Sequence, residues 1–165
     1  MQTVELLRTD AEEAYAALQR ALAGVSEGEA WAAISLQGAG YLHSPGSILG
    51  IVQHVATCKV MYASAAFRGL EVRWRDCADR IEALGSDWPA SLAYLEESQV
   101  YWMASWATLL PEELEAPRRT NWGEEWPAWR IFWTMTEHDI HHGAEIGALR
   151  DLLRVTGGVV PATAT

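Results

Sequence analysis

The chain has 165 residues, half of them hydrophobic, and its 12 basic and 22 acidic residues give a formal net charge of −10. This length suits a single domain, and the apolar content is enough for a sizeable core. The acidic balance argues against binding nucleic acid or an anionic membrane, both of which need a basic face on the protein. The sequence shows no signal peptide, no segment of transmembrane length and no cysteine framework, so a soluble cytoplasmic protein is expected.

Helical periodicity runs through almost the whole chain, and no segment shows convincing strand alternation. The first helix is predicted over residues 4–23, because apolar residues recur there at spacings of three and four with charged residues between them. Residues 29–37 could form a short helical piece, and residues 38–46 are expected to form a loop.

A serine begins the second predicted helix. Ser44 or Ser47 can cap it, since a serine hydroxyl accepts hydrogen bonds from the free backbone N–H groups of the first turn. The helix is expected to continue to about Arg68, with His54 on its apolar face.

The third long helix has a strong start signal. Asp87 supplies an acidic cap, and Pro89 follows in the first turn. This helix is expected to reach about Leu109. Residues 76–84 before it could form another short helix, and residues 112–125 after it are expected to form a long polar loop.

The last helix is predicted from Pro127 to about Arg154, followed by two glycines that end it and a flexible tail over residues 159–165. Residues 1–158 are thus predicted to form one all-α domain. Four long amphipathic helices indicate a four-helix bundle, and its long connections allow a topology other than up-down-up-down.

The chain has nine tryptophans, which is unusually many for its length. Four of them, Trp122, Trp126, Trp129 and Trp133, gather around the start of the last helix. They could line a pocket or fill the core, and core filling is the expectation.

His138 and His142 lie one turn apart on the last helix. Side chains four residues apart project from the same helix face, so the two imidazoles could bind one metal ion. Both lie on the apolar stripe that contains Met135 and Leu149, and they are therefore expected to point inward. Burial of two imidazoles without partners is costly, whereas a shared ion would satisfy both.

His54 is a third histidine on a core-facing stripe. A single histidine of this kind is more often a hydrogen-bonded core residue than a ligand, but three that converge indicate a site. Three neutral imidazoles from two helices would leave coordination positions open, as catalytic metal sites require.

Several neighbours could take part. Glu145 is the one weak candidate for a catalytic residue; it could act as a base, orient a ligand or pair with Arg150. His141 is expected at the surface or behind a ligand, and Asp139 is expected to face solvent. Cys58 could add a thiolate ligand, but a buried cysteine acting as a small hydrophobe is the expectation.

The segment His138 to Ile146, His-Asp-Ile-His-His-Gly-Ala-Glu-Ile, followed by leucine-arginine at 149–150, resembles the last-helix motif of the DinB/YfiT-like superfamily. The segment Ser47 to His54, Ser-Ile-Leu-Gly-Ile-Val-Gln-His, is similar to the second-helix motif of that family, in which the histidine closes a serine-started turn. Length and helix order match over essentially the whole chain. Ala144 and Glu145 depart from the more polar sequence of many members, on the surface that would face a substrate.

The resemblance implies a four-helix bundle in which His54, His138 and His142 bind a divalent transition metal, zinc or nickel above all. It also implies a homodimer, and no DNA binding despite the family's name. Related families include thiol transferases and isomerases that use bacillithiol, mycothiol or glutathione, and others described as hydrolases. Four functions are therefore open: an enzyme that activates a low-molecular-weight thiol, a metal-dependent hydrolase, a non-catalytic stress-response module that binds a metal or small ligand, or a purely structural dimer with a vestigial site.

Overall fold

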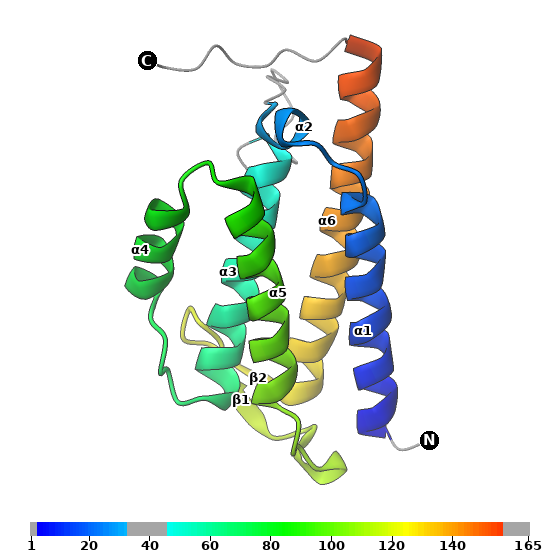
Figure 1. Cartoon of the computed structure of the whole chain (residues 1–165). Helices are drawn as coiled ribbons and strands as arrows, with labels where there is room; N and C mark the ends of the chain where they lie inside the picture. Colours follow the sequence, from blue (N-terminus) through cyan, green and yellow to red (C-terminus); the bar gives the residue numbers. More distant parts are fainter. Residues whose placement is uncertain (1–2, 33–45, 157–165) are drawn as a thin grey trace.

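The structure, a computed structural model, describes residues 3–32 and 46–156, and these residues are mostly helical. Four long helices form a bundle: α1 (Thr3–Leu22), α3 (Ile48–Phe67), α5 (Trp88–Ser105) and α6 (Ala128–Thr156). Two short helices, α2 (Glu27–Trp31) and α4 (Trp74–Leu84), lie in the connections (Figure 1). The predicted all-α four-helix bundle is therefore confirmed.

The structure tests most of the predicted helix ends. Ser47 caps α3, since its Oγ accepts a hydrogen bond from the Gly50 N–H at 3.1 Å; Ser44 lies outside the described residues. So do most of the predicted loop 38–46, the two glycines after the last helix and the predicted tail. Part of the helical piece predicted at 29–37 is present: α2 ends at Trp31, and residues 33–37 lie outside the described residues.

The long helices form two parallel pairs. Figure 1 shows α1 beside α6 running in one direction, and α3 beside α5 running in the other. In the first pair, Arg150 donates a hydrogen bond to the Ala21 carbonyl at 2.9 Å. In the second, the Gln53 amide donates to Ser91 Oγ at 3.1 Å. The topology is up-down-down-up. The connection that carries α4 runs back along the bundle to the end where α3 begins, so α5 runs in the same direction as α3.

The core has two apolar clusters, one toward each end of the bundle. One contains Leu18, Ile51 and Leu149, and the other contains Trp102 and Phe132, all of them buried. Between the clusters, α3 and α6 carry polar and charged residues that face one another. The fold therefore places a polar layer in the middle of an otherwise apolar interior.

The predicted loop 112–125 is only partly a loop. It holds a short 3-10 helix (Pro111–Glu113) and most of a two-stranded antiparallel sheet, β1 (Pro117–Arg119) and β2 (Glu125–Pro127), with Arg118 opposite Trp126. Strands of three residues are too short to show an alternating pattern, which is why the sequence did not indicate them.

The expectation that the four clustered tryptophans fill the core is wrong for three of them. Trp122, Trp129 and Trp133 are 49 %, 42 % and 60 % exposed, whereas Trp126 is half-buried and packs against the core. The inward face at the start of α6 is taken by smaller side chains such as Ile131, which is fully buried. Trp133 instead borders a cavity of about 290 Å³ on the outer face of α6, so the pocket alternative is the better description for this residue.

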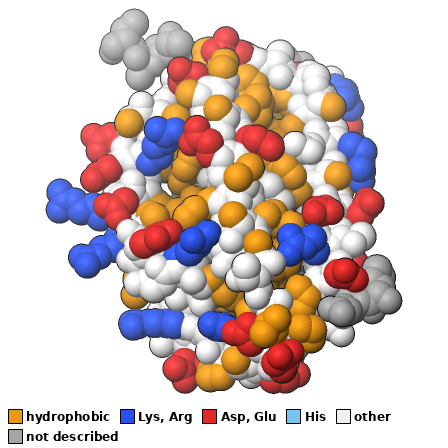
Figure 2. All heavy atoms as spheres, turned by 60° about the horizontal axis from the view of Figure 1, so that its bottom comes forward, with side chains coloured by type: hydrophobic (Ala, Val, Ile, Leu, Met, Phe, Trp, Pro, Cys, Tyr) orange, Lys and Arg blue, Asp and Glu red, His pale blue; other side chains and the backbone are white. Residues whose placement is uncertain are grey.

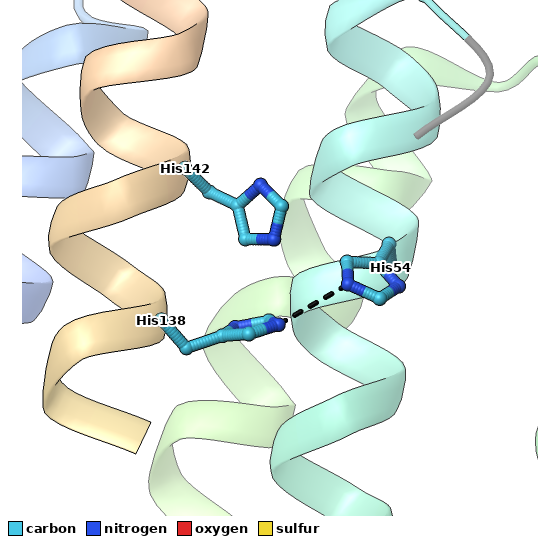
Figure 3. A group of neighbouring side chains, drawn as sticks. All are labelled: His54, His138 and His142. Atoms are coloured by element: carbon cyan, nitrogen blue, oxygen red, sulfur yellow. Dashed lines mark hydrogen bonds between the residues drawn. The ribbon is translucent and has the colours of Figure 1, made fainter. Parts of the chain in front are cut away.

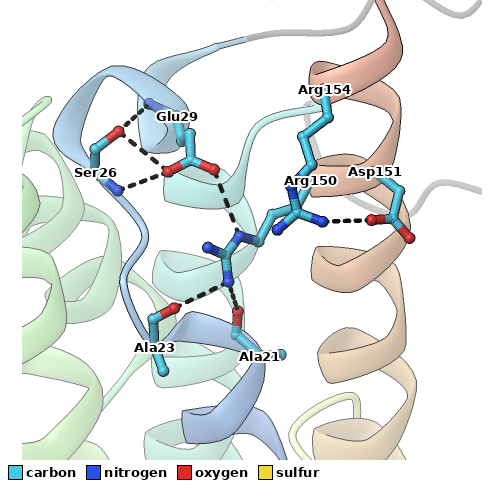
Figure 4. A network of polar contacts seen from close by, with 7 residues as sticks. All are labelled: Ala21, Ala23, Ser26, Glu29, Arg150, Asp151 and Arg154. Carbon is cyan, nitrogen blue, oxygen red and sulfur yellow. Dashed lines mark hydrogen bonds and ion pairs between the residues drawn. The ribbon is translucent and has the colours of Figure 1, made fainter.

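Arg150 ties three helices together near one end of the bundle (Figure 4). Its Nη1 donates to the carbonyls of Ala21 and Ala23, at 2.9 and 3.0 Å, and so satisfies groups at the end of α1 that lack helical partners. Its Nε lies 3.5 Å from Glu29 Oε1. Glu29 in turn forms a capping box with Ser26, which starts α2. These contacts hold α2 against α1 and α6.

The surface carries mixed charge. Figure 2 shows acidic and basic side chains interspersed on one face, with hydrophobic side chains reaching the surface between them. None of the described helices is long and apolar enough to cross a membrane.

Candidate metal centre

The three predicted histidines come together in the polar layer of the bundle. His54 projects from α3, and His138 and His142 project from α6 into the space between the two helices (Figure 3). The helix spacing brings His138 and His142 edge to face, with ring centroids 4.4 Å apart. The ring centroid of His54 lies 5.0 Å from each of the other two.

The nitrogen atoms are spaced as a metal site requires. The Nε2 atoms of His54 and His138 are 3.1 Å apart, and one nitrogen from each of the three rings lies within 4.8 Å of the others. In a tetrahedral zinc site with Zn–N bonds of about 2.0–2.1 Å, two ligand nitrogens are about 3.3 Å apart. The histidines could therefore hold a divalent ion.

The site opens to solvent on one side. A cavity of about 370 Å³ is lined by the three histidines together with Glu137 and His141. His142 lies at its buried end, with 1 % of its surface exposed, while His54 and His138 are half-buried. Three protein nitrogens beside an open cavity leave room for an exogenous ligand.

His138 is held in the neutral form. Burial, together with the neighbouring His142 and His54, lowers its pKa to about 2. Its Nδ1 is buried and has no hydrogen-bond partner among the described residues. A neutral imidazole is the form that binds metals, so His138 is ready to act as a ligand without losing a proton.

Glu145 contacts a histidine directly. One of its carboxylate oxygens lies 2.7 Å from His142 Nδ1, and both side chains are buried. Carboxylates in this position fix the orientation and tautomer of a ligating histidine and make it a better ligand. Of the three alternatives for Glu145, the structure supports orientation: Arg150 pairs with Glu29 instead, and Glu145 is not among the residues that line the cavity.

The expectation that Asp139 faces solvent is wrong. Asp139 is 2 % exposed, and its Oδ2 lies 2.5 Å from Nζ of Lys59, which is 1 % exposed. Burial lowers the pKa of Lys59 and raises that of Asp139, and the charge of each partner opposes the shift of the other. Sequence reasoning overlooked Lys59. It is the one Lys, Arg, Asp or Glu residue of α3, whose other residues are apolar or uncharged polar.

Cys58 and His141 lie beside the histidines. Cys58 Sγ is 3.7 Å from His54 Nε2, and burial raises the pKa of its thiol to about 12. It is therefore a thiol rather than a thiolate, in line with the expected role of a small hydrophobe. His141 is exposed at the surface, as expected. With His142 and Glu145 it forms a second group whose ligand atoms lie within 4.8 Å of one another.

A family model described as the DinB superfamily matches residues 10–146 of the chain. The chain belongs to the DinB superfamily. Searches of curated proteins and of solved structures found no match to this DinB superfamily protein. Membership and the histidine cluster together support a domain capable of binding a metal.

Proposed function

We propose that this DinB superfamily protein is a metal-dependent enzyme in which His54, His138 and His142 bind one divalent transition metal ion. The observation that carries the proposal is the convergence of three imidazoles from two helices on the wall of one open cavity. Zinc and nickel are the favoured ions, because imidazole suits both and both accept the soft sulfur of a thiolate.

The reaction that we favour is a transfer involving a low-molecular-weight thiol, as the family resemblance implies. When bound, the ion would supply Lewis-acid chemistry that makes a thiol, or in the hydrolase alternative a water, nucleophilic at neutral pH. The protein's own contribution is positional. Glu145 holds the His142 ring, burial keeps His138 neutral, and the cavity admits a small molecule beside the three rings.

Metal analysis tests the site. Protein purified without chelator should contain near-stoichiometric zinc or nickel by mass spectrometry, and His142→Ala should remove most of it. His141→Ala is the matched control, because this side chain is exposed on the same helix and is expected to leave the metal in place. Negligible metal in both wild type and His142→Ala refutes the site. Loss in His141→Ala would instead favour the group formed by His141, His142 and Glu145.

Cobalt substitution tests the choice of reaction. The absorption spectrum of the cobalt form should change on addition of bacillithiol, mycothiol or glutathione, because a thiolate sulfur is a strong ligand for such an ion. A spectrum indifferent to all three would discard the thiol reaction. A metal-dependent hydrolase, or a non-catalytic stress-response module, would then be the better proposal. The implied homodimer is a separate proposal, which sedimentation velocity can test.

A further inference from the structure

A second cavity, of about 460 Å³, lies between α3 and α4. Its α4 wall is formed by Trp74, Cys77, Ala78 and Ile81, and His54 belongs to its α3 wall. This volume falls within the range of sites that bind small organic molecules, which are concave and mostly apolar with a few polar groups.

Polar contacts hold α4 beside α3 on both sides of the cavity. Before α4, Ser64 Oγ donates to the Val72 carbonyl at 2.7 Å and accepts from the Val72 N–H at 2.8 Å. After α4, the Gln53 amide donates to the Gly85 carbonyl at 2.9 Å. The middle of α4 spans between these two attachments, on the outer side of the bundle (Figure 1). The cavity is therefore built into the fold rather than created by a loose helix.

His54 connects this cavity with the metal centre. It is the residue that lines both the α3–α4 cavity and the cavity of the three histidines. A group bound at the histidines and a group in the α3–α4 cavity would therefore both contact the His54 side chain. The two cavities together offer a polar, metal-binding end and an apolar end.

The charge at the apolar end restricts what can enter. Among the described residues that line the α3–α4 cavity, Glu82 is the one with a formal charge, and it is exposed at the rim. An anionic group would be repelled there and would lose hydration on the apolar wall. A neutral aliphatic or aromatic group meets neither cost.

We propose that the α3–α4 cavity binds the neutral, apolar body of the molecule whose metal-binding end lies at His54, His138 and His142. This inference rests on the proposed function and deepens it by naming the class of the second substrate of the transfer, the compound that reacts with the polar low-molecular-weight thiol: a small compound with a donor atom and a neutral aliphatic or aromatic body. His54 stands between the two ends.

Straight-chain thiols on the cobalt-loaded protein test the inference. Affinity measured from the cobalt spectrum should rise from ethanethiol to butanethiol to hexanethiol, by about fourfold per methylene group if each is fully buried. Ala78→Trp fills the cavity and should flatten this dependence. Ala83→Trp is the matched control: it places the same side chain on an exposed position of α4 that does not line the cavity, and it should retain the wild-type dependence.

A second probe separates this inference from the proposed function. 1-Hexanol should bind the metal-free protein, detected by saturation-transfer NMR, and Ala78→Trp should abolish the signal while Ala83→Trp retains it. Thiol binding without any dependence on chain length would overturn the cavity inference and leave the metal function standing. A cobalt spectrum indifferent to all thiols, with hexanol binding that depends on Ala78, would discard the thiol reaction of the proposed function and leave the α3–α4 cavity as a site for neutral apolar groups. If Ala78→Trp and Ala83→Trp show the same chain-length dependence of thiol affinity and the same hexanol signal, the inference is overturned.

Discussion

Lys59 and Asp139 form a buried ion pair that joins α3 to α6 beside the candidate metal centre, with Nζ and Oδ2 2.5 Å apart. Asp139 directly follows His138 in the chain, so the pair anchors the backbone that carries one of the histidines. The ring of Tyr15 on α1 covers the ammonium group, at 5.2 Å from its centroid. The pair therefore fixes the relative position of the two helices that carry the histidines.

Removal of one partner should be more damaging than removal of both. Lys59→Met leaves a buried carboxyl group without its cation, and we expect the free energy of unfolding to fall by about 3–5 kcal/mol in urea titrations. The double variant Lys59→Met/Asp139→Leu should recover most of this loss, because well-packed apolar residues often replace a buried ion pair without cost. A single variant as stable as wild type would mean that the pair contributes nothing.

Glu145→Gln should weaken metal binding without unfolding the protein. The amide accepts a weaker hydrogen bond from His142 than the carboxylate does, and changes of this kind typically reduce metal affinity about 10–100-fold. Competition with a chromophoric chelator measures the effect. Glu137→Gln is the control, since Glu137 is exposed at the cavity rim and should leave the affinity within about twofold of wild type. Equal affinity for all three proteins would remove Glu145 from the site.

The metal-free protein should lose stability as the pH falls below about 6.5, the ordinary pKa of histidine. In the folded protein the pKa of His138 is about 2. Between these values the unfolded chain takes up a proton that the folded protein does not, so the free energy of unfolding falls with decreasing pH. One site contributes a slope of at most about 1.4 kcal/mol per pH unit.

Urea titrations from pH 7 to pH 4 with a chelator present would measure this slope. His138→Leu should have a smaller pH dependence of the free energy of unfolding than wild type, because it lacks the His138 imidazole. The carboxylates contribute similarly to both proteins, so the difference between the two slopes reports on His138. Parallel curves for the two proteins would show that His138 becomes protonated in the folded state.

Cys58→Ser should keep the metal and slightly lower stability. Burial keeps Cys58 a thiol, and replacement by a hydroxyl puts a more polar group into the same half-buried space, at a cost of about 1–3 kcal/mol if it finds no partner. Metal content and thermal unfolding measure the two effects. Loss of metal from a folded Cys58→Ser protein would make Cys58 a ligand and overturn the assignment of three histidines.

At Gly143, α6 packs closely against α1. A Cβ at this position would lie 3.4 Å from the Leu18 Cα, whereas a Cβ at Gly147 would meet no atom within 4 Å. Gly143→Leu should therefore force the helices apart and cost about 1–3 kcal/mol. Gly147→Leu should be neutral or stabilising by up to about 1 kcal/mol, through better helix propensity. Similar unfolding midpoints for the two variants would contradict the close approach.

The bundle and the histidine cluster were predictable because both depend on regular spacing. Long apolar stripes indicate the four helices, and the interval between His138 and His142 places both rings on one face. Asp139 could not be assigned from that stripe, because α6 packs against both α1 and α3 and buries a wider face than one stripe suggests. Lys59 left a signal, a single charge in a helix rich in apolar residues, that points to a buried partner.

The exposed tryptophans and the small sheet were harder to predict. Tryptophan combines a large apolar surface with an N–H group that needs a partner, so its burial depends on the tertiary contacts around it. Trp129, for example, donates its indole N–H to Glu115 across the loop at 3.3 Å. Strands of three residues are specified by their neighbours in space rather than by their own sequence.

The two parallel helix pairs give the molecule a natural line of separation. α1 packs along α6, and α3 along α5, more extensively than α3 packs against α6, and the three histidines lie on opposite sides of that boundary. A bound ion would link the α1–α6 pair to the α3–α5 pair. Its removal should leave each half internally intact while the halves part more often, and amide hydrogen exchange would accelerate first along the facing sides of α3 and α6.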